Sequence, residues 1–257
     1  MYYIQSLGAL TLSGLEGLGR TFIFFFQAVS AAVTPKFYPK QIFKQMMDIG
    51  FYSLPVVGMT AIFTGAVLAL QSYSGFSRFN AESSIATVVV LSITRELGPV
   101  LAGLMVAGRV GASIAAEIGT MRVTEQIDAL STLSTNPLKY LIAPRLIAGL
   151  LTLPILVLIA DIIGVMGGYL VAVNKLGFNS SSYLKSTLEY LEFKDVFSGL
   201  VKASIFGFIV ALMGCYHGFH SGRGAQGVGK ATTSAVVSAS VLILIANYII
   251  TEVFFSD

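Results

Sequence analysis

Residues 49–77 read IGFYSLPVVGMTAIFTGAVLALQSYSGFS, and none of them is charged. A transmembrane helix needs about 20 predominantly apolar residues, so this stretch is long enough to cross a lipid bilayer. Four further apolar stretches follow it, at residues 83–108, 146–173, 196–216 and 231–251. The pattern therefore predicts an all-α integral membrane protein with five transmembrane helices.

The composition of the whole chain supports this interpretation. Hydrophobic residues make up 55% of the 257 residues and charged residues only 11%, whereas a soluble domain carries about 25% charged residues. A single Cys and two His residues leave no disulfide framework, thiolate zinc site or other metal chemistry to expect. The net charge of +3 is too small to indicate a nucleic-acid partner. We expect one transmembrane domain over residues 1–257, without catalytic residues or a metal site.

The N-terminal segment, residues 1–34, is predicted to form an interfacial helix. Its apolar run at residues 21–33 is too short to span a bilayer comfortably and is typical of a helix that lies in the interface. Joined to residues 1–19 across Glu16 and Arg20, the segment would be long enough to span. No positively charged segment precedes the first apolar run, so the mature chain is expected to begin at or near Met1.

The distribution of Lys and Arg residues predicts the orientation, because these residues favour cytoplasmic loops. With the N-terminus in the cytoplasm, the inner loops hold more of them than the outer loops. The inner set is Lys36, Lys40, Lys44, Arg109, Arg122, Lys139, Arg145, Arg223 and Lys230, and the outer set is Arg78, Lys175, Lys185 and Lys194. The outer connection at residues 174–195 is the longest one, and residues 183–190 in it are expected to form a short helix.

A polar segment at residues 109–145 separates the second and third predicted spans. Ile118, Met121, Glu125 and Asp128 are spaced three or four residues apart, so they would share one face of a helix. Such a short cytoplasmic helix can dock into a groove on a partner protein or lie on the lipid headgroups. The spacing alone leaves both interpretations open.

Part of this segment, EIGTMRVTEQIDAL at residues 117–130, resembles the signature of the MlaE (YrbE) family, the permeases of bacterial lipid ABC transporters. The similarity extends over nearly the whole chain. Further matches are Asn136-Pro137, residues 140–145, residues 227–233 before the last span, and residues 95–100.

The resemblance implies both a function and a set of partners. Members of this family move phospholipid or a related lipid between the inner and outer membranes, which bears on outer membrane lipid asymmetry. Two copies would face each other in the bacterial inner membrane, with an MCE-domain protein on the periplasmic side and, in some systems, a STAS-domain protein. A separate cytoplasmic ATPase would bind ATP and Mg²⁺ and engage the segment as a coupling helix. The implied coupling residues are Glu117, Gly119, Thr120, Met121, Glu125 and Asp128.

Arg95 and Glu96 interrupt the second predicted span near its middle. An Arg at that depth costs about 2.5–3.5 kcal/mol on insertion scales, so the pair is expected to avoid lipid. It either lines a lipid-binding cavity, in which Arg95 holds a phosphate bidentately, or forms ion pairs that fix helix packing. Pro99 lies nearby and frees backbone carbonyl groups that need a polar setting.

Three further residues complete the list of candidates. We expect Lys202 to extend to the outer interface, with a place in an outward-facing lipid chamber as the alternative. Asp161 is expected to be an interhelical hydrogen-bonding group rather than a proton carrier, because no relay of acidic groups accompanies it. Tyr73 ends the first span and either anchors it at the interface or lines a lipid exit. The candidate lipid-binding residues are Arg95, Glu96, Tyr73 and Lys202.

The Gly-rich stretch at residues 224–231, GAQGVGKA, nearly matches a phosphate-binding loop. Its last position is Ala231, which lacks the hydroxyl group that would hold magnesium, and apolar spans flank it on both sides. We therefore expect a flexible, basic inner loop, followed by Thr232, Thr233 or Ser234 as the cap of the fifth helix.

Two other function classes compete with the lipid permease. One is a stand-alone secondary transporter or channel with Arg95, Glu96 and Asp161 as an ion path. The other is a structural membrane scaffold, for which these charges matter only to packing.

Overall fold

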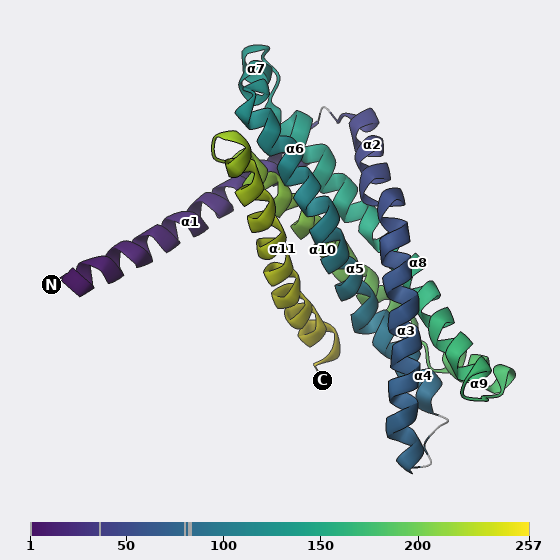
Figure 1. Ribbon diagram of the computed structural model, residues 1–257. Helices are drawn as coiled ribbons and strands as arrows, with labels where there is room; N and C mark the ends of the chain where they lie inside the picture. Colours follow the sequence, from purple (N-terminus) through teal and green to yellow (C-terminus); the bar gives the residue numbers. More distant parts are fainter. Residues whose placement is uncertain (1, 36, 80, 82–83, 257) are drawn as a thin grey trace.

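The computed structural model describes residues 2–35, 37–79, 81 and 84–256, and Figure 1 shows their arrangement. Of the first 14 residues, only the side chain of Leu12 is described. The predicted start of the second span at Ser83 and the predicted inner-loop residue Lys36 lie outside the described residues.

Five helical runs are long and apolar enough to cross a membrane, which confirms the predicted fold class. No strand occurs in the part of the chain that the structure describes. The five runs are Pro39–Phe79, Ile85–Val123, Leu138–Asn174, Phe193–Phe219 and Gly224–Phe255. Every run extends beyond the apolar stretch that predicted it, because polar turns at the ends continue the helices.

Several of these runs are built from more than one helical element. The first consists of α2 (Pro39–Ile49), η1 (Phe51–Ser53), α3 (Leu54–Phe76) and η2 (Ser77–Phe79). The second consists of α4 (Ile85–Ser92), η4 (Ile93–Leu97), α5 (Gly98–Val106), η5 (Ala107–Gly111) and α6 (Ala112–Val123). The third consists of η6 (Leu138–Ile142) and α8 (Ala143–Asn174), and the last two are α10 (Phe193–Phe219) and α11 (Gly224–Phe255). Outside the runs lie α1 (Tyr2–Val33), α7 (Gln126–Thr132) and α9 (Ser180–Glu189).

Helix α1 projects from the half of the bundle that carries α7 (Figure 1). Its contact with the bundle depends on Phe24, which is buried against the rings of Tyr216, Phe219 and His220 at the end of α10. Among the described residues, α1 is not one of the runs that qualify as spans. Its position in the membrane interface stays a prediction.

Helix α8 is at the centre of the bundle and packs against α3 and α10. At the crossing with α10, a Cβ added to Gly149 would lie 2.5 Å from the carbonyl oxygen of Gly207. Only glycine allows the two backbones to approach so closely, which is the usual reason for small residues between membrane helices. Helix α9, which the sequence predicted as a short helix, lies at the opposite end from α7 (Figure 1).

The predicted single helix face in the polar segment is wrong. Helix α6 ends at Val123, and Glu125 adopts a left-handed backbone conformation with φ of 59° before α7 begins. Because this reversal changes the direction of the chain, Asp128 does not continue the face that carries Ile118 and Met121.

The predicted loop at residues 224–231 is also wrong, because these residues form the first turns of α11. The Gly-rich pattern has a packing cause instead: a Cβ on Gly227 would lie 2.3 Å from the carbonyl oxygen of Gly222, so the turn from α10 needs glycine there. Thr232 and Thr233 do not cap the helix, since their hydroxyl groups donate to the carbonyl oxygen of Gly229 within it.

Candidate functional site

Arg95 and Glu96 lie in η4, a short π-helical segment inside the second run. Pro99 has no N–H group and cannot donate to the carbonyl group of Arg95, four residues earlier in the chain. The ammonium group of Lys202 on α10 takes this place and donates to the Arg95 carbonyl oxygen at 2.8 Å. The irregular backbone therefore has a polar partner, as a backbone at membrane depth requires.

The carboxylate of Glu96 accepts hydrogen bonds from two other helices. Lys202 Nζ donates to its Oε1 atom at 2.6 Å, and Thr251 Oγ1 on α11 donates to the same atom at 2.9 Å. Asn247 Nδ2, also on α11, donates to Oε2 at 2.8 Å. Glu96 thus ties the second run to α10 and α11 together.

Lys202 is fully buried. The interpretation that it extends to the outer interface is wrong, because its ammonium group points at η4 and both of its hydrogen bonds end there. An ammonium group this far from water must be paired, and the Glu96 carboxylate supplies the opposite charge.

Arg95 forms the second ion pair of the site. Its Nε atom donates to Asp195 Oδ1 at 2.7 Å, and the other carboxylate oxygen of Asp195 accepts from the backbone N–H of Glu192 in a capping box. The ring of Phe255 lies 4.7 Å from the guanidinium carbon. About a third of the Arg95 side chain, 35%, remains exposed, so the guanidinium group is held from one side and open on another.

These side chains form one unit, called the polar cluster below. Its members are Arg95, Glu96, Asp195, Lys202, Asn247 and Thr251. Arg95, Glu96 and Lys202 were candidates from the sequence, whereas Asp195, Asn247 and Thr251 were not. The Glu192 to Asp195 spacing is a capping pattern that pointed to a helix start there, and Asn247 and Thr251 are polar residues four apart in an apolar helix.

Tyr73 does not belong to the polar cluster. It lies near the end of α3, where its ring packs edge-on against Phe178 with 6.0 Å between ring centroids. The structure therefore places this candidate in the apolar packing between the first run and the connection that follows α8.

The candidate coupling residues divide into two groups. Glu117 is bound to Arg145 at 2.7 Å, and Gly119 accepts a hydrogen bond from the Ser221 hydroxyl group at 3.4 Å. These contacts tie the first group to the bundle, although half of the Glu117 side chain, 50%, stays exposed. The half-buried Met121 belongs to the same group and packs against the core. Thr120, Glu125 and Asp128 form the exposed group, in which Asp128 pairs with Arg122 at 2.8 Å.

Asp161, on α8, is not a member of the polar cluster. Its Oδ1 atom is buried and has no hydrogen-bond partner in the described part of the chain. The interhelical hydrogen bond that the sequence predicted for Asp161 is therefore not formed among these residues. The atom packs against the backbone of Gly98, where an added Cβ would lie only 1.8 Å away from it. The carboxyl group therefore occupies the space that a side chain at residue 98 would need.

This packing predicts a cost for Gly98→Ala. The new methyl group would meet both Asp161 and the carbonyl oxygen of Ile93, at 2.9 Å, so we expect a loss of about 1–3 kcal/mol of stability, as for other overpacked cores. Gly108→Ala is the matched control, because nothing lies within 4 Å of an added Cβ there. Unfolding in mixed detergent micelles measures both, and equal stabilities of the two variants would contradict the packing.

A family model described as "Permease MlaE" matches residues 42–253. The chain is 67% identical over 251 residues to a "Probable ABC transporter permease protein" of Rickettsia bellii, with 98% of this chain and 97% of that protein covered. It is 35% identical over 255 residues to the "Intermembrane phospholipid transport system permease protein MlaE" of Haemophilus influenzae, with 98% and 97% covered. It is also 36% identical to "TRIGALACTOSYLDIACYLGLYCEROL 1, chloroplastic" of Arabidopsis thaliana, over 89% of this chain and 65% of that protein.

Proposed function

Because the chain belongs to the MlaE permease family and is a multi-pass permease of an ABC transporter, we propose that it moves phospholipid or a related lipid between the inner and outer membranes of a bacterial envelope. The name of the Haemophilus influenzae relative supports this substrate class. The proposed location is the inner membrane, with the N-terminus in the cytoplasm.

The observation that carries the proposal is the half-open guanidinium group of Arg95. Asp195 engages its Nε edge, and 35% of the side chain stays exposed beside Phe255. An arginine fork matches the geometry of a phosphate group. The ammonium nitrogen of Lys194 lies 5.2 Å from the centroid of the same Phe255 ring and adds a positive charge. We assign the lipid headgroup to this place.

The transport step requires partners. We propose that a second copy completes the lipid cavity, that a cytoplasmic ATPase binds ATP and Mg²⁺, and that an MCE-domain protein receives or delivers lipid on the periplasmic side. A STAS-domain protein is a further candidate. Closure of the ATPase would push on the end of α6 and on α7, and the rigid second run would carry this movement to Arg95 and Glu96 in η4.

Photocrosslinking with a diazirine-bearing phospholipid tests the headgroup site. The variant combines Arg95→Met with Asp195→Asn, because the amide keeps an acceptor for the Glu192 N–H group and no buried charge is left unpaired. We expect labelling of η4 and α11 to fall about tenfold, the effect of losing one charge-assisted hydrogen bond. Arg78→Met, outside the cluster, should label normally. Unchanged labelling in the double variant, with normal membrane insertion, would refute the assignment.

The competing classes make different demands on the same residues. A stand-alone ion path needs Arg95, Glu96 and Asp161 connected in one line, but Asp161 Oδ1 packs against Gly98, whereas Arg95 and Glu96 are hydrogen-bonded to Asp195 and Lys202. A structural scaffold predicts that leucine at residues 95 and 96 leaves lipid crosslinking and envelope integrity unchanged. Membership of a permease family of ABC transporters favours neither class.

A further inference from the structure

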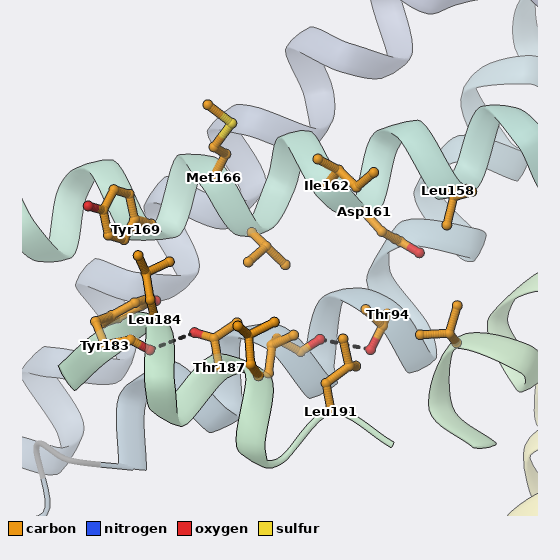
Figure 2. Close-up of a pocket in the computed structure, with 14 residues that line it drawn as sticks. Thr94, Leu158, Asp161, Ile162, Met166, Tyr169, Tyr183, Leu184, Thr187 and Leu191 are labelled. Atoms are coloured by element: carbon orange, nitrogen blue, oxygen red, sulfur yellow. Dashed lines mark hydrogen bonds between the residues drawn. The ribbon is translucent and has the colours of Figure 1, made fainter. Parts of the chain in front are cut away.

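A cavity of about 430 Å³ lies between α8, α9 and the second run. Figure 2 shows that Asp161 leaves α8 toward the side on which Thr94, Thr187 and Leu191 lie. The other lining residues are almost all apolar. The volume falls in the range of small-molecule sites, about 300–1,000 Å³.

Two of the residues that line this apolar space, Asp161 on α8 and Tyr183 on α9, each carry a buried polar atom without a partner among the described residues. These atoms are Asp161 Oδ1 and the hydroxyl oxygen of Tyr183. Both side chains are only 5% exposed. The other three polar side chains that Figure 2 labels are satisfied. The hydroxyl groups of Thr94 and Thr187 donate to backbone oxygens at 2.8 and 2.9 Å, and the hydroxyl group of Tyr169 is hydrogen-bonded to that of Ser180 at 2.7 Å. Buried polar atoms without partners are rare, and here two of them line one cavity.

The spacing of these groups requires an elongated ligand. The Tyr183 hydroxyl oxygen lies 3.6 Å from the position of a Cβ on Gly168, which is seven residues beyond Asp161 on α8. At a rise of 1.5 Å per residue, the two polar points are about 10 Å apart along the helix. A chain of several methylene groups with an oxygen function fits such a slot, whereas a compact ion does not.

The charge of the cavity indicates what kind of polar group it accepts. No Lys, Arg or His residue is among the described residues that line it, so nothing offsets the burial of an anionic headgroup. An unpaired carboxylate is costly in an apolar cavity, and the neutral acid of Asp161 can donate a hydrogen bond. The hydroxyl group of Tyr183 is protonated at neutral pH, as tyrosine hydroxyl groups are, and is also a donor.

The cavity is accessible from the membrane. Ile162, Met166 and Leu188 line it and are strongly exposed on the surface of the bundle. Ile162 and Met166 lie in the outer half of the third run, where lipid chains surround the protein in the predicted orientation, and Leu188 lies on α9 beyond the outer end of that run. A lipid can therefore enter sideways without passing through water.

We propose that this cavity is a second lipid site, which binds a long-chain lipid whose polar group is an uncharged hydroxyl or ester oxygen. Asp161 and Tyr183 hold the oxygen function or functions, and the apolar walls hold the chain. The site goes beyond the proposed transport of phospholipid, because it shares no side chain with the polar cluster. Thr94 lines the cavity, whereas its neighbours Arg95 and Glu96 are hydrogen-bonded to side chains on α10 and α11.

The test uses the full chain in its native membranes and two photoactivatable probes of equal chain length, a long-chain alcohol and a long-chain sulfonate. After irradiation, the labelled peptides are identified by mass spectrometry. We expect the alcohol to label residues 158–169 and 183–196 about tenfold more than the sulfonate, the difference that a hydrogen bond and an unpaired anion produce. An unlabelled monoacylglycerol, which carries an ester, should compete with the alcohol.

Matched variants connect the labelling to the cavity. Leu184→Trp fills it, whereas Leu170→Trp adds the same bulk outside it at a residue of similar exposure, 43% against 45% for Leu184. Labelling should fall about tenfold in the first and stay unchanged in the second. Asp161→Leu should remove the preference for the alcohol, and Asp161→Asn, which keeps a donor, should retain it.

Three results would overturn the proposal. They are equal labelling by both probes, labelling that survives Leu184→Trp, and crosslinks from the cavity to another protein chain instead of lipid. The Arg95→Met and Asp195→Asn double variant should label normally here. Failure of the headgroup assignment can therefore be told apart from failure of this one.

Discussion

Lys202→Met will destabilise the folded protein by about 2–3 kcal/mol. Removing one partner of a buried ion pair costs about 3–5 kcal/mol because the other charge remains without compensation. We expect a smaller loss here, since 36% of the Glu96 side chain is exposed and solvent can partly compensate its charge. The substitution also leaves the Arg95 carbonyl group, which Pro99 cannot serve, without its ammonium donor. Unfolding in mixed detergent micelles measures the loss.

A second substitution separates the charge effect from the shape effect. Glu96→Gln in the Lys202→Met background removes the uncompensated carboxylate and should recover more than about 1 kcal/mol. Lys185→Met, at an exposed residue of α9, should change stability by less than about 0.5 kcal/mol. If Lys202→Met were as mild as this control, the pair at residues 96 and 202 would have no structural role.

Ion pairs hold the mid-span charges in the polar cluster, and the place of Arg95 and Glu96 in a lipid-binding cavity stays a prediction. Lys202 and Asp195 are buried and pair with Glu96 and Arg95, so the ion pairs do fix the packing of α10 against the second run. The outer sides of Arg95 and Glu96 remain open. Packing therefore orients these two side chains in advance of the proposed lipid headgroup, which lowers the entropy cost of the proposed binding.

The transmembrane helices could be predicted from the sequence because bilayer thickness sets a minimum length for an apolar run. The same logic misplaced their ends. Polar residues 109–123 were assigned to a cytoplasmic segment, but they continue the second run as η5 and α6. A helix can continue with polar residues once it has left the hydrocarbon core, because these residues are then in contact with water. The composition therefore indicates which residues lie in the hydrocarbon core, but it does not indicate where the helix ends.

The partners of the buried charges could not be predicted from the sequence. The direction of a side chain depends on helix rotation, which a nearly uniform apolar sequence leaves undetermined. Lys202 lies one and a half turns inside its predicted span, a place from which it can reach either water or a neighbouring helix. Pro99 decides between them, because it leaves the Arg95 carbonyl group in η4 without its helical donor and Lys202 supplies one.

Glu125→Lys combined with Asp128→Lys will weaken binding of the proposed ATPase about a hundredfold, while the protein still inserts and folds. Both carboxylates are exposed at the turn between α6 and α7, at the end of the bundle opposite α9 (Figure 1). Leu133 follows α7 with 75% of its side chain exposed. The two carboxylates and the Leu133 side chain would fit a basic groove with an apolar base on the ATPase. Lysines in place of the carboxylates would then meet positive charges of that groove, and like charges brought together in an interface cost several kcal/mol.

A pull-down with the purified ATPase measures this effect, and Glu189→Lys with Glu252→Lys is the matched control. That variant makes the same change in net charge at exposed residues of the opposite end, so it should bind the ATPase normally. Asp128→Lys also breaks the pair with Arg122, but an exposed pair contributes only about 0–1 kcal/mol, and folding is expected to survive. Undiminished binding by the Glu125→Lys and Asp128→Lys variant would mean that the ATPase docks elsewhere. The proposed movement of the second run would then need another cause.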